Sequence, residues 1–345
     1  MEADPGVIGM SQIARHGLLA GGNFITDYVK IIEAWPKQDM LVNVVSESMS
    51  NGGGPYNVLK DLVALGVSFP LEGAGLVGND ANGQWIRRDC DEHGIDATQL
   101  RTTRDAATSY TDVMCVKSDG RRTFFHQRGA NALLSEDHVD LTASHARVFL
   151  LAYLLLLDTL DCLEDDGRTG ASRLLERARE LGFITAIDTV SSPDPKFRKV
   201  VTAAIPQADV FFSNEVEASL ILEEQIGTDA ASLESAAAKI AALGSPGWVV
   251  VHSSQGAVCR QSDGTAVYQP ALRLPQDFIK GSTGAGDAFS AGFLSGVHDD
   301  CGAADCLLRG VCTAAASVAH PSPSQGVLPL RECLGLAPRF GFQDP

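Results

Sequence analysis

The sequence predicts an α/β protein in which one large, mostly parallel sheet is accompanied by a smaller β-sheet. From about residue 147 onward, short apolar runs alternate with helix-like segments, which is typical of parallel strands joined by helices. Residues 39–49 and 108–128 alternate apolar and polar side chains instead, as half-exposed strands do. A glycine-rich segment at 281–293 merges into a run with helical spacing. These three observations predict two sheets of different character and a ligand-binding turn.

The apolar runs predict the strands of the large sheet, and polar residues follow them. Residues 148–157 form the longest run, which is too short to cross a bilayer and is followed by a helix-like stretch at 168–181. The later runs are 183–187, 210–212 and 248–251, and they lead to Asp188, Asn214 and Ser253. Because ligands bind beyond the carboxyl ends of parallel strands, we expect these polar residues to lie near a site.

The alternating stretches predict a small antiparallel sheet apart from the main one, with a hairpin turn at Asp119-Gly120. No internal repeat or long linker divides the chain. We therefore expect a single domain over residues 17–345, preceded by an N-terminal extension at 1–16.

The composition narrows the class of protein. A chain of 345 residues with 45% hydrophobic content can bury a large core. Its formal charge of −16 argues against nucleic acid or an anionic membrane as a partner. The eight cysteines form no CxxC pair, and the first twenty residues contain acidic side chains and no continuous apolar core. We expect reduced thiols, no signal peptide and a cytoplasmic location.

The segment GSTGAGDAFSAGF at 281–293 predicts an anion site. Gly284 and Gly286 permit a tight turn in which the backbone amides converge, and the helix that follows adds its partial positive charge. Asp287 stands where that helix begins, although a carboxylate repels an anion. It either caps the helix or serves as a base toward an attacking hydroxyl, and the residues alone leave both interpretations open.

Two N-terminal groups of residues suit a polar ligand. Asn23 and Asp27 follow an apolar run, and Asp27 is either an acceptor for two hydroxyl hydrogens or an exposed loop carboxylate. Residues 52–57, GGGPYN, are either an ordinary glycine loop before a helix or a close backbone approach that presents the amide of Asn57.

Further along the chain, two more pairs are candidates. Asn214 and Glu217 lie between a predicted strand and a helix, where they either hold Mg²⁺ through water or leave Glu217 as a solvated charge. Arg128 and Asn131 follow the second alternating stretch and are suited to a sugar or a phosphate.

Gly73, Gly75 and Gly78 match the dinucleotide pattern GxGxxG. That pattern must open a helix, and we expect a strand and a turn here, with no helix behind it. An oxidoreductase is therefore disfavoured.

The run from Thr283 to Asp287 resembles the DTxGAGD signature of the ribokinase-like (PfkB-type) carbohydrate kinases. The resemblance extends from about Gly22 to Gly335 and implies a three-layer α/β/α fold with a β-sheet lid built from 26–50 and 106–130. It also implies that the amides of Gly284, Ala285 and Gly286 stabilise the transferred γ-phosphoryl group while Asp287 takes the proton from the sugar hydroxyl.

The same resemblance assigns the remaining candidates. It implies sugar contacts for Asn23, Asp27, Gly53, Gly54, Asn57, Arg128 and Asn131. It implies ATP contacts for Asn214, Ser253, Gly256, Thr283, Gly284, Gly286, Ala316 and His320. Asn214 and Glu217 match the family's NxxE motif, which orders Mg²⁺ through water.

One position departs from the family pattern. Many relatives carry an Asp of a potassium site six residues before the base, whereas this chain has Gly281. We therefore do not expect activation by K⁺ through the usual geometry.

The sequence thus predicts an ATP- and Mg²⁺-dependent kinase acting on a hydroxyl of a sugar or sugar-like molecule. A nucleoside kinase of the same fold and an inactive nucleotide- or sugar-binding regulator are the alternatives. A homodimer through the lid is a further expectation.

Overall fold

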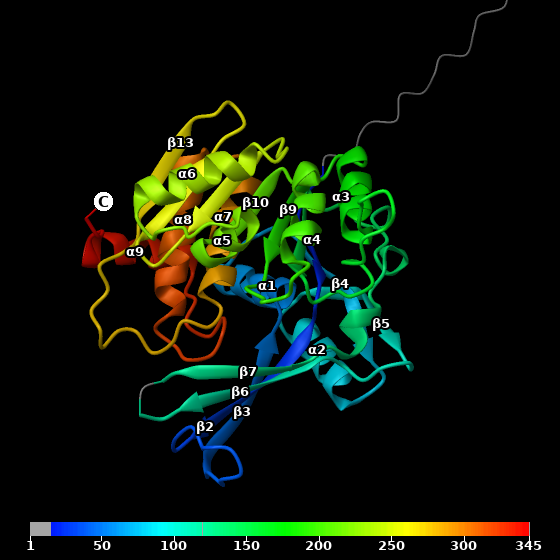
Figure 1. Cartoon of the computed structure of the whole chain (residues 1–345), viewed down its shortest axis with the longest axis vertical. Helices are drawn as coiled ribbons and strands as arrows, with labels where there is room; N and C mark the ends of the chain where they lie inside the picture. Colours follow the sequence, from blue (N-terminus) through cyan, green and yellow to red (C-terminus); the bar gives the residue numbers. More distant parts are fainter. Residues whose placement is uncertain (1–14, 119, 345) are drawn as a thin grey trace, which may run out of the picture.

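The computed structural model describes residues 15–118 and 120–344 (Figure 1). Most of the predicted N-terminal extension, residues 1–14, and Asp119 of the predicted hairpin turn lie outside the described residues. Among the helices described, none is long and apolar enough to span a membrane.

The main sheet has nine strands in the described part of the chain, in the order β13-β12-β11-β10-β9-β8-β1-β4-β5. Its strands are β1 (Leu18–Gly22), β4 (Leu71–Gly78), β5 (Asp96–Thr103), β8 (Val148–Leu154), β9 (Ile184–Thr189), β10 (Val210–Asn214), β11 (Trp248–His252), β12 (Gly256–Arg260) and β13 (Ala266–Pro270). The pairs from β5 to β11 are parallel, and β12 and β13 add an antiparallel edge. The predicted mostly parallel sheet is confirmed.

Helices cover both faces of this sheet. Two apolar clusters divide the strand residues by alternation, as Val148 and Leu150 belong to one cluster and Phe149 and Leu151 to the other. The first cluster contains side chains of α1 (Gly54–Leu65), α2 (Ala81–Glu92), α7 (Ala285–His298), α8 (Ala303–Ser317) and α9 (Leu330–Phe340). The second contains side chains of α3 (Gly170–Glu180), α4 (Phe197–Ala204), α5 (Glu215–Leu222) and α6 (Ala230–Ala241). The main sheet and the helices on its two faces therefore form three layers.

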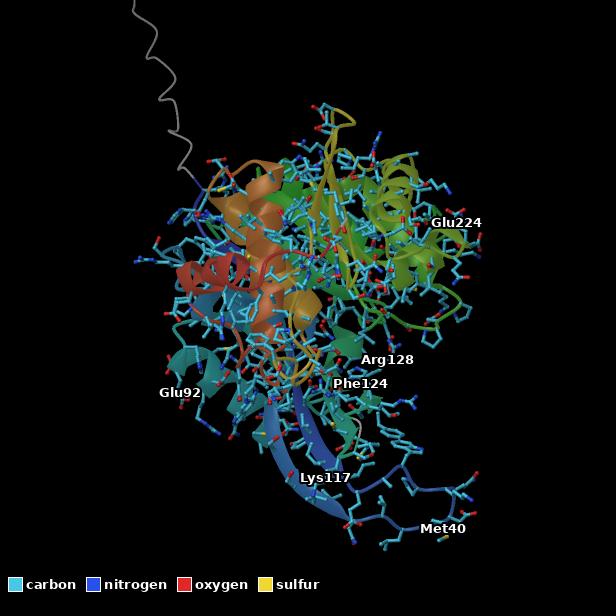
Figure 2. All side chains as sticks on the ribbon, turned by 90° about the vertical axis from the view of Figure 1, so that its left-hand side faces the viewer. Met40, Glu92, Lys117, Phe124, Arg128 and Glu224 are labelled. Carbon is cyan, nitrogen blue, oxygen red and sulfur yellow. The ribbon has the colours of Figure 1, made fainter. Side chains whose placement is uncertain are left out.

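A second sheet projects from one end of this body as a lid (Figure 1). Its strands are β2 (Ile25–Ile32), β3 (Val44–Gly52), β6 (Tyr110–Val116) and β7 (Arg122–Gln127), in the order β3-β2-β6-β7. The side view in Figure 2 places Met40 at its far end and Phe124 and Arg128 near the body.

The prediction that this sheet is antiparallel is wrong at its centre, because β2 and β6 pair in parallel. Both strands leave the body and run outward, so Thr26 lies opposite Tyr110 at the base and Ile32 opposite Val116 farther out. Only the outer pairs, β2 with β3 and β6 with β7, are antiparallel hairpins.

The prediction that no helix follows the GxGxxG glycines is also wrong. Helix α2 begins at Ala81, and the Asp80 side chain caps it by accepting a hydrogen bond from the Gly83 amide at 2.9 Å. The same carboxylate accepts bonds from the amide and the hydroxyl of Thr108, at 2.7 and 2.6 Å. A carboxylate therefore occupies the helix start where a dinucleotide would place its pyrophosphate.

Candidate active site

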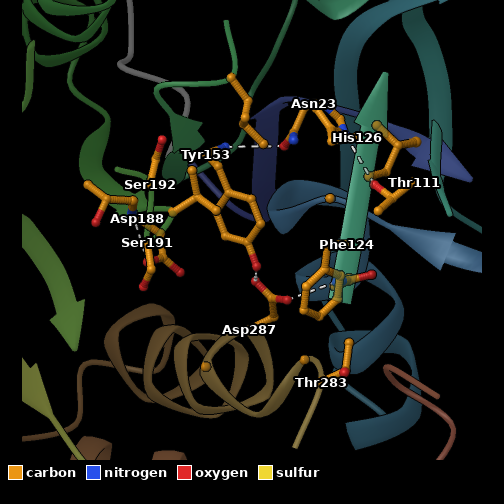
Figure 3. Close-up of a pocket in the computed structure, with 18 of the residues that line it drawn as sticks. Asn23, Thr111, Phe124, His126, Tyr153, Asp188, Ser191, Ser192, Thr283 and Asp287 are labelled. Carbon is orange, nitrogen blue, oxygen red and sulfur yellow. Dashed lines mark hydrogen bonds between the residues drawn. The ribbon is translucent and has the colours of Figure 1, made fainter. Parts of the chain in front are cut away.

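A cavity of about 570 Å³ lies between the carboxyl edge of the main sheet and the lid (Figure 3). The sheet and the helices that follow its strands supply one side of the lining, and the lid supplies the other. It is lined by Asn23, Ile25, Asp27, Gly53, Asn57, Thr111, Phe124, His126, Tyr153, Leu156, Asp188, Thr189, Val190, Ser191, Ser192, Pro193, Asn214, Glu217, His252, Thr283, Gly284, Gly286 and Asp287.

Asp287 lies in the first turn of α7 with only 2% of its surface exposed. The N-cap of that helix is Gly284, so Asp287 is not the cap residue. Its two oxygens accept hydrogen bonds from other elements, Oδ1 from the Tyr153 hydroxyl at 2.5 Å and Oδ2 from the Asn57 amide at 2.8 Å. Burial raises the pKa of Asp287 to about 6, and the two donated bonds oppose that rise.

The glycine turn lies beside this carboxylate. Gly284 has φ +78°, and a Cβ there would come within 2.9 Å of Pro323 Cβ, so both the backbone angle and the space require glycine. Thr283, Gly284 and Gly286 line the cavity, whereas Ala285 does not. The Ala285 amide donates to the Ser282 carbonyl at 3.2 Å. The start of α7 thus presents backbone amides and positive helix-dipole charge to the same space as Asp287.

A second buried carboxylate lies at the end of the neighbouring strands. Glu217 accepts hydrogen bonds from the hydroxyls of Thr189 at 3.0 Å and Ser191 at 2.9 Å, and from the backbone N–H of Asn214 at 3.1 Å. Burial raises the pKa of Glu217 to about 7. Asp188 lies beside it, and burial together with the charge of Glu217 raises the pKa of Asp188 well above its ordinary value. Figure 3 shows Asp188 and Ser191 across the cavity from the lid residues.

The lid side of the cavity carries the third group of polar residues. Asp27 is 7% exposed, and burial, with a smaller contribution from the charge of Asp287, raises its pKa to about 7. A Cβ on Gly52 would lie 2.4 Å from Asp27 Oδ1, so glycine is needed for this close approach. Asn23 accepts a bond from the Tyr153 amide at 3.2 Å, while its buried Nδ2 has no partner among the described residues. This group offers both acceptors and a donor to a polyhydroxylated ligand.

Several of the predicted site residues are brought together here, and others are not. The cavity lining includes Asn23, Asp27, Gly53, Asn57, Asn214, Glu217, Thr283, Gly284, Gly286 and Asp287. It does not include Gly54, Arg128, Asn131, Ser253, Gly256, Ala285, Ala316 or His320.

Local contacts account for some of these exclusions. Gly54 lies behind the Tyr153 ring, which a Cβ would approach to 2.7 Å. Arg128 is ion-paired with Asp158, and Asn131 is buried against the Phe24 carbonyl. Their roles in binding the sugar or the nucleotide stay predictions.

Sequence reasoning did not find the aromatic residues of the site. Tyr153 is the second-to-last residue of β8 and lies inside an apolar run, where a tyrosine is indistinguishable from a core residue. Phe124 and His126 come from β7, and both line the cavity. The sequence indicated Asp188 only as the polar residue that follows a predicted strand.

Comparisons with known proteins show similarity to sugar kinases. The chain is 25% identical over 283 residues to an ATP-dependent ribose-1-phosphate kinase of Halopiger xanaduensis, covering 81% of this chain and 83% of that protein. It is 26% identical over 273 residues to a fructokinase of Klebsiella pneumoniae, covering 76% and 83%. The structure of an Arabidopsis thaliana ribokinase complexed with ribose and ATP matches with a TM-score of 0.76 and 22% identity, covering 93% of this chain and 98% of that one.

The predicted ribokinase-like fold is therefore confirmed. The model of the pfkB family of carbohydrate kinases matches residues 21–330, which is most of the chain. The chain belongs to the pfkB carbohydrate kinase family, and it is a phosphotransferase that acts on sugar hydroxyls.

Proposed function

We propose that the protein transfers the γ-phosphate of ATP to a hydroxyl of a sugar or sugar-like substrate, with Asp287 as the general base. The observation that carries this proposal is the position of a buried carboxylate with a pKa of about 6 beside the glycine turn at the start of α7. A base whose pKa lies just below neutral pH is ionised yet still able to take a proton. The turn offers amides to the phosphoryl group at the same place.

In this mechanism Asp27, Asn23 and Asn57 hold the sugar with its reacting hydroxyl toward Asp287. Asp287 takes the hydroxyl proton as the oxygen attacks the γ-phosphate and ADP leaves, and the backbone amides of Gly284 and Gly286 face the charge that develops on the phosphoryl oxygens. Preorganised donors of this kind often contribute about 3–4 kcal/mol each to a transition state. The lid residues Thr111, Phe124 and His126 close the cavity above the sugar and exclude water.

The residues at the end of β10 fit a hydrated divalent cation. Glu217 and Asp188 are neighbouring buried carboxylates, and the charge of Glu217 raises the proton affinity of Asp188, so a nearby cation would relieve this repulsion. Both Glu217 oxygens already accept protein hydrogen bonds, which suits an ion held through water by Asn214 and Glu217. Mg²⁺ at this place would neutralise charge on the nucleotide phosphates.

A nucleoside kinase is the second candidate, and one observation favours it. The rings of Phe124 and Tyr153 both line the cavity, and aromatic faces stack on nucleobases. The acidic and amide groups around Asp27 suit a sugar alone equally well. The choice between the two is a question of substrate and leaves the role of Asp287 unchanged.

We also propose a homodimer through the lid. Large apolar side chains are exposed on the lid and its connecting loop, namely Trp35, Met40, Leu41, Val44, Val45, Phe124 and Phe125. Figure 2 places Met40 at the free end of this sheet. An apolar surface beside the edge strands β3 and β7 suits pairing with a second copy. Light scattering of the native chain and of Leu41→Lys tests this, since a wild-type monomer would contradict it.

The location we propose is the cytoplasm. All eight cysteines are unpaired, and six of them are buried. Free thiols of this number suit a reducing compartment.

ADP release from MgATP, measured across sugars, sugar phosphates and nucleosides, tests the proposed function. We expect turnover with one class of substrate and its loss in Asp287→Asn, which keeps the shape of the side chain but cannot take a proton. Nucleotide binding without turnover of any of these compounds would instead favour an inactive nucleotide- or sugar-binding regulator. Turnover that survives in Asp287→Asn would remove Asp287 as the base.

A further inference from the structure

The Asn57 amide, which donates to the base, is itself held by a second amide that does not reach the cavity. Asn51 lies at the end of the lid strand β3, is 5% exposed and is absent from the cavity lining. Its Nδ2 donates to Asn57 Oδ1 at 2.7 Å and to Ser324 Oγ at 3.2 Å. Asn57 Nδ2 then donates to Asp287 Oδ2 at 2.8 Å.

The groups at the two ends, the Asp287 carboxylate and the Asn51 NH₂ group, fix which atom of the Asn57 amide donates and which accepts. An ionised carboxylate only accepts hydrogen bonds, so Asn57 must turn its NH₂ group toward Asp287 and its oxygen away from it. Asn51 supplies the donor that this oxygen requires, and its second N–H is directed to Ser324. Asn51, Asn57, Ser324 and Asp287 are each no more than 7% exposed, so an amide left without a partner here would be costly.

We propose that Asn51 is a positioning residue for the phosphoryl-transfer reaction. It holds the Asn57 amide in the orientation that donates to Asp287, and so links the foot of lid strand β3 to the catalytic base. This inference rests on the proposed role of Asp287. It assigns no contact between Asn51 and either substrate.

Loss of the hydrogen bond from Asn51 to Asn57 should change the proton affinity of Asp287. The titratable groups facing this carboxylate from the surrounding elements are Asp27 on β2, Asp61 on α1, Tyr153 on β8, Asp188 on β9, Glu217 on α5 and His252 on β11. Neither of the two hydrogen bonds that the Asn51 amide donates goes to one of these groups. A freed Asn57 amide donates less to the ionised form, so the proton affinity of Asp287 should rise.

The test is the titration of the Asp287 carboxyl carbon by NMR, in protein labelled with ¹³C at the aspartate carboxyl and assigned by the signal missing from Asp287→Asn. This measurement requires no substrate, so it remains informative if no sugar is turned over. We expect Asn51→Ala and Asn51→Leu each to move the Asp287 titration to higher pH by about one pH unit. Asn57→Leu should move it at least as far, and the double variant Asn51→Leu/Asn57→Leu no farther than Asn57→Leu, because Asn51 acts through Asn57.

Ser50→Ala is the matched control. Ser50 is the neighbouring residue on β3, and its buried hydroxyl has no partner among the described residues. It should leave the titration unchanged. In turnover assays the acidic limb of kcat should move with the titration in the Asn51 variants, whereas a purely structural role would lower kcat equally at all pH values.

Three outcomes would overturn the proposal. They are an unmoved Asp287 titration in both Asn51 variants, a double variant that shifts farther than Asn57→Leu, and failure of both Asn51 variants to fold, which would make Asn51 a structural residue. Turnover that survives in Asp287→Asn would instead refute Asp287 as the base, and this outcome is distinct from the three that concern Asn51.

Discussion

Replacement of Tyr153 by Phe tests how the base is tuned. The Tyr153 hydroxyl donates to Asp287 Oδ1 at 2.5 Å in a site where Asp287 is 2% exposed. Phenylalanine keeps the ring that packs against Gly54 and removes only this donor. The substitution therefore isolates one hydrogen bond to the carboxylate.

The expected change in pKa follows from the energy of that bond. A hydrogen bond to a charged group contributes roughly 1.5–3 kcal/mol, which corresponds to about one to two pKa units. Burial already holds the pKa of Asp287 at about 6, and Tyr153 opposes this rise, so its loss should move the pKa to about 7–8. Asp287 must be ionised to take a proton. The acidic limb of kcat should move upward by the same amount.

The assay is kcat against pH with saturating MgATP and sugar. Well above both pKa values, the variant should approach the wild-type rate. Below them, its rate should fall about tenfold for every pH unit by which the acidic limb has moved. Tyr28→Phe is the matched control, because the Tyr28 hydroxyl donates to Asn82 Oδ1 at 2.6 Å outside the cavity lining. A rate loss of equal size at every pH, or an unmoved limb, would refute the reasoning.

Three further predictions concern a buried acid, the monovalent cation and the sugar. Burial raises the pKa of Asp161 from 3.8 to about 7, so its contribution to stability falls as pH rises through that interval, by roughly 4 kcal/mol at most. Asp161→Asn should therefore raise the melting temperature more near pH 8 than near pH 4, and a change of equal size at both pH values would contradict this. K⁺ should not activate the enzyme relative to tetramethylammonium, because the Arg122 guanidinium lies against Gly281 and donates to the Pro321 carbonyl at 2.7 Å; strong activation would show otherwise. Asp27→Asn should raise the KM for the sugar by about ten- to a hundredfold and lower kcat less, and a variant with unchanged KM would exclude Asp27 from binding.

The central strands were predictable because parallel strands are buried on both faces. Residues 148–157, 183–187, 210–212 and 248–251 are apolar without alternation, and they correspond to β8, β9, β10 and β11. The direction of β6 was not predictable in this way. Alternation identifies a half-exposed strand but does not say from which end it leaves the body, and that decides whether it pairs in parallel with β2.

Some residues of the candidate site could likewise be predicted from the sequence, and others could not. Asp287, Asn57 and Glu217 were found because glycine turns and helix starts mark where polar side chains can converge. Tyr153 and Asn51 were missed because neither stands in such a motif. Their importance arises from hydrogen bonds to Asp287 and Asn57, which only the packed structure brings within reach.

The charge of the cavity explains why these donors are needed. Asp27, Asp188, Glu217 and Asp287 are each at most 7% exposed, and burial raises the pKa of all four. Without compensation, burial would leave the base protonated near neutral pH. Asp287 accepts hydrogen bonds on both of its oxygens, and both bonds oppose the rise that burial causes in its pKa, which is about 6. The two bonds therefore favour the ionised form of Asp287 at the place where a proton must be taken.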